Sequence, residues 1–143
     1  MVGTRKATSN RRDFCDSQIQ EMAQRGDYTV VSGLAYGIDI AAHKACLKHG
    51  VATLGVVGHG LEQVYPIMHR TVGDKMFGNG GLVTDFVRET PIDGTNFLRR
   101  NPLIAGLADA TIIVESAEKG DSLVTADIAD SYNRNVFALP GRS

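Results

Sequence analysis

The stretch YTVVSGLAYGIDIAAHKACLKHGVATLGVV, residues 28–57, decides the fold of this chain. Its two ends, residues 28–32 and 52–57, are short, β-branched and mostly apolar, as expected of strands buried on both faces of a sheet. Residues 38–49 between them are patterned as a helix that begins after a glycine-containing turn. A strand, a helix and a second strand in so few residues predict a parallel βαβ unit.

The alternation of strands and helices continues along the chain. Further strands are predicted at residues 82–86, 110–115 and 135–139, and further helices at 12–25, 70–77, 101–107 and 123–132. Alternating strands and helices predict an α/β fold, with a mostly parallel sheet that carries helices on both faces. The first residues, MVGTRKAT, resemble the end of a strand and its loop, and FALPGRS stops just after a strand. We therefore expect one domain over residues 1–143, truncated at both ends.

Composition limits the function classes. The chain has 143 residues, 43% of them apolar, and 15 basic against 16 acidic side chains give a net charge of −1. A broadly basic surface is excluded, so any site for nucleic acid or phosphate must be local. Cys15 and Cys46 form no C-x-x-C pair, which favours a reducing compartment over a disulfide scaffold. With no run of about 18 apolar residues and no signal-peptide core, a cytoplasmic protein without a membrane segment is expected.

Glycine-containing loops follow most of the predicted strands. In a parallel sheet such loops gather at the carboxyl edge, where ligands bind, and glycine lets backbone N–H groups approach an anion closely. Each loop also leads towards a helix N-terminus, which favours anions. The candidate phosphate pocket comprises the loop Gly3, Thr4, Arg5 and Lys6, the loop after residue 32 with Ser32, Gly33 and Gly37, and the group Phe97, Arg99, Arg100 and Asn101.

Each of these features also has a purely structural interpretation. Glycine after a strand is often only a turn, and a single phenylalanine such as Phe97 is more often a core residue than a stacking surface. Arg99 and Arg100 would alternatively cap neighbouring loops or pair with Asp85 and Glu89. Four loops at one predicted edge favour the phosphate pocket, in which arginines face phosphate and Phe97 stacks on a base.

Several catalytic interpretations fail on the sequence. The chain has no P-loop, no dinucleotide G-x-G-x-x-G and no G-x-S-x-G nucleophile elbow. Its histidines, His43, His49, His59 and His69, lack the spacing of metal ligands, so no metal is expected. Asp39 is expected to orient or cap backbone near the start of its helix. We therefore expect no catalytic residues and no cofactor.

Five motifs in order closely resemble the DNA-processing protein A family, also called DprA or Smf. They are GTRKAT, VVSGLAYGIDIAAHKACL, GVVGHGLEQVYPIMHR, NFLRRNPLIAGLADATIIVESAEKGDSLVTA and VFALPG, and together they cover nearly the whole chain. The resemblance implies an extended Rossmann-like fold that binds single-stranded DNA without marked sequence preference. It also implies a homodimer that loads the RecA recombinase during natural transformation, and no enzymatic activity.

The resemblance carries over residue by residue. The family's G-[ST]-R corresponds to Gly3, Thr4 and Arg5, its S-G-x-A-x-G-I-D to residues 32–39, and its F-x-x-R-N to Phe97, Arg100 and Asn101. Its S-G-S-L-I-T-A corresponds to residues 120–126, which adds Gly120 and Ser122 to the implied DNA pocket.

Three features depart from the family pattern. Pro102 stands where a basic residue is usual, and Asp121 replaces a glycine and adds a negative charge near the implied phosphate. We also expect the family's N-terminal domain and the segment beyond P-G to be missing from this sequence, and both bear on dimerisation and RecA contact.

Two other functions stay open on the sequence. One is a nucleoside-monophosphate phosphoribohydrolase on a related fold, although EKGDSLVTAD lacks the P-G-G of those enzymes. The other is a sensor or carrier of a small nucleotide on the same fold.

Overall fold

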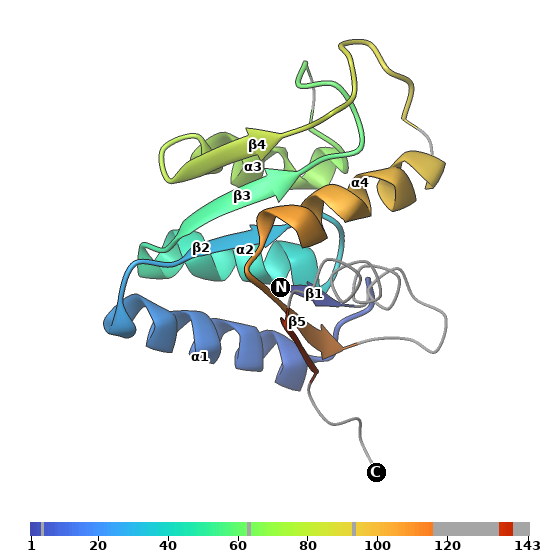
Figure 1. Ribbon diagram of the computed structural model, residues 1–143. Coiled ribbons are helices and arrows are strands. Elements are labelled where there is room, and N and C mark those ends of the chain that lie inside the picture. Colours follow the sequence, from blue (N-terminus) through green and yellow to red (C-terminus); the bar gives the residue numbers. More distant parts are fainter. Residues whose placement is uncertain (4, 63, 93, 116–134, 139–143) are drawn as a thin grey trace.

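A computed structural model describes residues 1–3, 5–62, 64–92, 94–115 and 135–138. Within them, strands and helices alternate along the chain (Figure 1). The strands are β1 (Val2–Gly3), β2 (Thr29–Ser32), β3 (Ala52–Val56), β4 (Gly80–Val83), β5 (Ala110–Glu115) and β6 (Asn135–Ala138). The helices are α1 (Ser9–Arg25), α2 (Ile38–His49), the 3-10 turn η1 (Ile67–His69), α3 (Arg70–Met76) and α4 (Gly94–Leu107).

All paired strands are parallel. One sheet has the order β1-β5-β6 and the other the order β2-β3-β4. The two sheets meet at β1 and β2, where Met1 N donates to Val31 O at 2.9 Å and Ser32 Oγ donates to Met1 O at 2.6 Å. The chain thus proceeds from β1 in one direction through β2 to β4, and returns to the other side of β1 with β5 and β6. This reversal is the topological switch point of a Rossmann-like fold.

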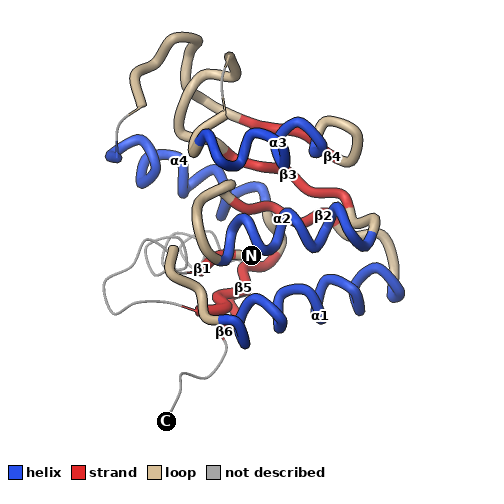
Figure 2. The backbone as a smooth tube through the Cα atoms, turned by 180° about the vertical axis from the view of Figure 1, so that it is seen from behind, coloured by secondary structure: helices blue, strands red, loops and turns tan. Residues whose placement is uncertain are grey.

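Helices cover both faces of the sheets. On one face α2 contacts β2 and β3 and packs between α1 and α3, while α4 contacts the same two strands on the other face. Figures 1 and 2 show these two faces from opposite sides. The predicted α/β class, with a mostly parallel sheet and helices on both faces, is confirmed.

Each face of the sheet buries its own apolar cluster. On the face covered by α1 and α2, these helices contribute Cys15, Ile19 and Ile38, all without exposed surface. On the other face, Ile104 of α4 packs with Val56 and other strand residues. Burial of such side chains is worth about 1.5–3 kcal/mol each, so the βα layers hold the loops at the strand ends in fixed positions.

Most predicted elements lie where the pattern placed them. Helix α1 begins at Ser9, three residues before its predicted start, and two further elements need a correction. Helix α4 begins at Gly94 and not at residue 101, so Arg99, Arg100 and Asn101 lie inside the helix, as does Pro102. The sequence pattern placed the helix start too late for two reasons. Proline is favoured in the first turn of a helix, so Pro102 suggested a start at residue 101. The polar side chains before it suggested a loop. The predicted helix at 123–132 lies outside the described residues.

The second correction concerns β4, predicted at 82–86 and found at Gly80–Val83. Glycine weakens a strand pattern, but a Cβ at Gly80 would collide with Thr53 O of β3, so glycine is required for this pairing. The strand ends before Thr84, whose single hydroxyl proton lies between His59 O at 2.8 Å and Val57 O at 3.2 Å.

None of the helices that the structure describes combines the length and apolar composition needed to cross a bilayer.

Candidate nucleic-acid interface

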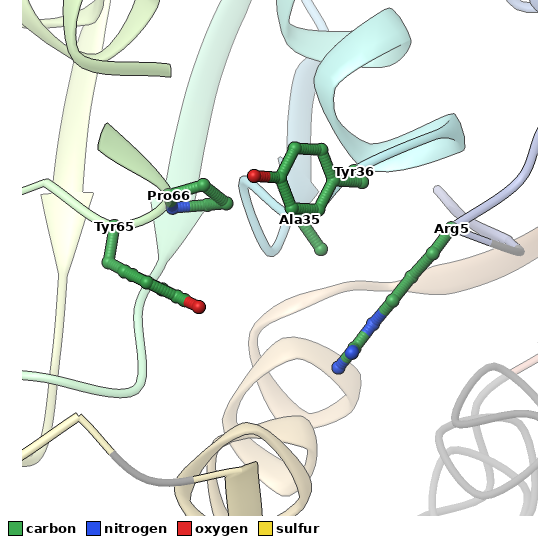
Figure 3. A pocket seen from close by; sticks show the side chains of 5 residues that line it. All are labelled: Arg5, Ala35, Tyr36, Tyr65 and Pro66. Carbon is green, nitrogen blue, oxygen red and sulfur yellow. The ribbon is translucent and has the colours of Figure 1, made fainter. Parts of the chain in front are cut away.

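The loops after β1, β2 and β3 converge at the carboxyl edge of the sheet. Together they line a pocket formed by Arg5, Ala35, Tyr36, Tyr65 and Pro66. Arg5 comes from the loop after β1, the strand at which the strand order reverses. Figure 3 shows the guanidinium of Arg5 and the hydroxyl of Tyr65 reaching towards the same opening. The prediction that these loops gather in one place is therefore confirmed.

The loop after β2 is held at Gly33 from two sides. Asp39 Oδ2 accepts from Gly33 N at 3.0 Å, and Arg100 Nη1 donates to Gly33 O at 2.9 Å. A Cβ at Gly33 would lie 2.6 Å from both the Arg100 guanidinium and Asp39 Oδ2. Only glycine leaves room for these two buried side chains, and Asp39 holds backbone as expected.

The next residue, Leu34, is held by two histidines. It is fully buried and has a φ of 59°, a left-handed conformation that costs about 1–2 kcal/mol for a side chain with a Cβ. Its N–H donates to His43 Nε2 at 3.1 Å, and its carbonyl accepts from His69 Nδ1 at 2.8 Å. These bonds stabilise a loop conformation that Leu34 would not adopt alone.

His43 is a neutral imidazole, and the partners of its two ring nitrogens fix its tautomer. Its Nε2 accepts from Leu34, and its Nδ1 lies 2.7 Å from Thr53 Oγ1, which in turn donates to Val30 O at 3.1 Å. Nδ1 therefore carries the proton. Complete burial lowers the pKa of His43 to about 3, because the imidazolium would lose its hydration. His43 thus acts as a structural link between the loop and the sheet.

Arg100 is the main departure from the expected pocket. Its side chain is only 4% exposed, and Nη1 also donates to Val56 O at 2.7 Å, which ties the end of β3 to the loop after β2. Its Nε donates to Asn101 Oδ1 at 2.9 Å. The alternative in which Arg100 caps neighbouring loops is confirmed, and this also explains why a cation precedes the apolar half of α4: backbone carbonyls replace its water.

Arg99, by contrast, is exposed, and its guanidinium lies 5.5 Å from the centroid of the Phe86 ring. The attraction between a cation and an aromatic ring favours one orientation of the Arg99 guanidinium. Phe97 lies in α4, but its side chain is outside the described part of the structure, so its predicted stacking stays a prediction.

The other candidate residues divide into exposed and buried groups. Arg5 and Lys6 are exposed, whereas Ser32, Gly33 and Asn101 are buried. Gly37 has a φ of 80° and caps α2, a conformation that favours glycine. Gly3 lies in β1. Thr4, Gly120 and Ser122 lie outside the described residues.

Two histidines and two tyrosines contribute to this edge without belonging to the expected set. They are His43, His69, Tyr36 and Tyr65. The spacing of histidines along the chain tests only whether they could bind a metal together, and it does not predict bonds to a loop. Within the described residues, no group of three His, Cys, Asp or Glu side chains could hold a metal ion. The order of loops along the sheet identifies Tyr36 and Tyr65 as edge residues, but only side-chain packing shows that they share a pocket.

The two cysteines belong to the core. Burial raises the pKa of the Cys15 thiol to about 12 and that of Cys46 to about 11, because a thiolate there would lose its hydration. Both thiols stay protonated and unreactive at neutral pH.

Comparison with known proteins shows similarity to one family along the whole chain. The family model described as DNA recombination-mediator protein A matches residues 1–143. Protein Smf of Escherichia coli is 42% identical over 131 residues, which cover 91% of this chain and 34% of that protein. DNA processing protein DprA of Streptococcus pneumoniae is 36% identical over 143 residues, covering 99% of this chain and 49% of that protein. The chain thus spans a third to a half of these relatives.

Two solved structures share the fold. The X-ray structure of DNA processing protein A from Streptococcus pneumoniae has a TM-score of 0.88 and 31% identity, over 99% of this chain and 49% of that one. A structure of DNA processing protein A from Helicobacter pylori has a TM-score of 0.89 and 29% identity, over 99% of this chain and 64% of that one. The Helicobacter pylori structure was solved for insight into the single-stranded DNA binding mode of that protein.

Proposed function

Because the chain belongs to the DNA recombination-mediator protein A family, we propose that it is a single-stranded DNA-binding domain that serves DNA uptake and recombination. The observation that carries this proposal is the exposed pair Arg5 and Lys6, which follows the central strand β1 beside a pocket lined by tyrosines. Cations beside aromatic rings match the phosphates and unpaired bases of a single strand.

In this proposal the candidate residues have two roles. Arg5, Lys6 and Arg99 are exposed, and they contact DNA phosphates. Ser32, Gly33 and Gly37, together with Arg100 and Asn101, act by fixing the loop after β2. The proposal extends to Gly3 and Thr4 beside Arg5, to the ring of Phe97 as a stacking surface, and to Gly120 and Ser122 as phosphate-binding loop residues.

The wider assignments rest on the family. A recombination mediator assists a recombinase, which supports RecA as the partner and natural transformation as the setting. A cytoplasmic location, a homodimer and the absence of catalysis complete the proposal. Sedimentation of the protein would test the dimer, and a pull-down with RecA would test that contact.

The alternatives drawn from the sequence are not favoured. The family match covers the whole chain, and the phosphoribohydrolase alternative has no comparable support. A single-strand binder and a nucleotide carrier differ in one respect that can be measured: only the carrier binds a mononucleotide as tightly as an oligonucleotide.

A filter-binding titration tests the proposal. We expect single-stranded DNA to bind more tightly than duplex of several sequences, because the cations are few and local on a chain of net charge −1. Thymidine monophosphate should bind far more weakly than the strand. Equal or tighter duplex binding would overturn the proposal.

The salt dependence of the same titration tests the contact at Arg5. Arg5→Ala should reduce the slope of log affinity against log salt by about 0.7, as expected for one lost single-strand phosphate contact. Arg25→Ala is the matched control, because Arg25 is exposed at the C-terminal end of α1 and pairs with Glu21. An unchanged slope for folded Arg5→Ala would remove Arg5 from the interface.

A further inference from the structure

The loop after β4 packs closely against the loop after β3 (Figures 1 and 2). The two backbones meet at Gly60, where an added Cβ would lie 2.8 Å from Arg88 Cα and 2.9 Å from Val87 O. Thr84 Oγ1 lies 2.8 Å from His59 O, so the side chain of the first residue after β4 also contacts the other loop. The loop after β4 therefore has a defined position, although it lies at the surface.

Glu62 fastens the turn at the tip of this loop. Thr90 N donates to Val87 O at 3.2 Å, which closes a β-turn over residues 87–90. Glu89, at the third position of that turn, has a φ of 63°, a conformation that favours glycine. Its N–H donates to Glu62 Oε1 at 2.8 Å. A carboxylate that accepts from this N–H offsets part of the backbone strain and holds the turn against the loop after β3.

Phe86, which precedes this turn, contacts Arg99 of α4. Its N–H donates to Thr84 Oγ1 at 3.0 Å, so the backbone of Phe86 is fixed on one side by Thr84 and on the other by the turn. The guanidinium carbon of Arg99 lies 5.5 Å from the centroid of the ring, within the limit of about 6 Å for a cation–π contact. A guanidinium on a ring uses its flat face, which leaves the N–H donors in its plane for the oxygens of a phosphate.

We propose that Phe86 and Glu62 are positioning residues for DNA binding: Glu62 holds the loop after β4 in place, and the ring of Phe86 orients the Arg99 guanidinium towards a phosphate of the strand. This inference rests on the proposed function and adds to it the residues that give Arg99 one orientation. A mobile arginine side chain loses rotamer entropy when it binds an anion, whereas a side chain already held on a ring loses less. The loop after β4 thus contributes to affinity through Arg99.

A double-mutant cycle tests the role of Phe86, with the affinity for a thymidine oligonucleotide of about 12 nucleotides as the readout. Phe86→Leu should weaken binding about 2-fold to 5-fold, which corresponds to the 0.5–1 kcal/mol of an exposed cation–π contact. Phe86→Tyr, which keeps the ring, should retain the wild-type affinity. In the Arg99→Ala background, Phe86→Leu should have no further effect, because the side chain that the ring orients is absent.

The role of Glu62 is isolated by two substitutions that both remove its charge. Glu62→Gln keeps an oxygen that accepts from Glu89 N, and Glu62→Ala does not. Because neither variant repels phosphate, a difference between them reports on the hydrogen bond alone. We expect Glu62→Ala to bind the strand about 2-fold to 5-fold more weakly than Glu62→Gln. This difference should vanish in the Arg99→Ala background.

NMR of the Arg99 side chain reports on its orientation without DNA. Its Nε–H signal should show a ring-current shift from Phe86 in the wild-type protein, and this shift should be lost in Phe86→Leu and reduced in Glu62→Ala. Phe77→Leu is the matched control, because Phe77 is 63% exposed and lies between α3 and β4, at the opposite edge of the sheet. It should change neither the signal nor the affinity.

Each outcome decides between the proposals. Wild-type affinity in folded Phe86→Leu, or an equal loss with and without Arg99, would overturn the positioning role and leave strand binding in place. Equal affinities of the two Glu62 variants would overturn the role of Glu62. If Phe86→Leu fails to fold, the Glu62 pair decides the question. Wild-type protein that shows the ring-current shift but binds no strand would remove the proposed function, and the positioning role with it.

Discussion

Arg100→Met is expected to destabilise the fold and to leave the number of DNA phosphate contacts unchanged. Methionine keeps much of the apolar stem but leaves Gly33 O and Val56 O without the guanidinium that now lies 2.9 Å and 2.7 Å away. Each unsatisfied buried carbonyl costs about 1–3 kcal/mol, or roughly 2–6 kcal/mol together. Loss of the buried charge removes its desolvation cost and offsets part of this, so we expect a loss of about 2–4 kcal/mol.

Urea unfolding followed by circular dichroism measures the change. Arg99→Met is the matched control, because Arg99 is exposed on the same helix, and its effect should stay within about 0.5 kcal/mol. The salt dependence of DNA affinity gives a second reading, and folded Arg100→Met should keep the wild-type slope. A loss of stability below about 1 kcal/mol, with a slope reduced by about 0.7, would refute the reasoning and show that Arg100 contacts phosphate.

Three other substitutions probe the same edge. Gly33→Ala should lower both stability, by about 1–3 kcal/mol, and DNA affinity, because the new Cβ displaces Arg100 and Asp39; a urea melt and a DNA titration measure the two effects. His43 has a pKa lowered to about 3, so wild-type stability should fall as pH drops below about 6.5, by roughly 2 kcal/mol at pH 5. His43→Gln, which does not titrate, should lack that part of the fall when unfolding is compared at pH 7 and 5. Phe97→Ala should lose about 1–3 kcal/mol of DNA binding if the ring stacks on a base, or about 3–5 kcal/mol of stability if it is a core residue; melts and titrations together separate the two.

The sequence predicts the layers of this fold better than the roles of its polar residues. Residues 38–49 and 110–115 form the predicted helix and strand without change, because apolar periodicity reports directly on which faces are buried. The order of strands and loops also places Arg5 and Gly33 at one edge. These inferences need only local pattern and the rules of parallel sheets.

The role of Arg100 follows from contacts that join residues far apart in the chain. Its carbonyl partners lie 67 and 44 residues away, and no local pattern distinguishes an arginine that caps strands from one that meets phosphate. Likewise, His43 and His69 bond the two backbone groups of Leu34 from different helices. Buried polar networks of this kind depend on tertiary geometry, which sequence periodicity does not encode.

The central claim is that single-stranded DNA binds at the loops that follow the strands, and amide NMR spectra of the protein titrated with a thymidine oligonucleotide test it most directly. We predict that the largest shift changes occur at Arg5, Tyr36 and Tyr65, which line the carboxyl-edge pocket. Gly50 and Asp109, which precede β3 and β5 at the opposite edge, should be unaffected. Shift changes concentrated around Gly50 and Asp109, with the pocket residues unmoved, would contradict it.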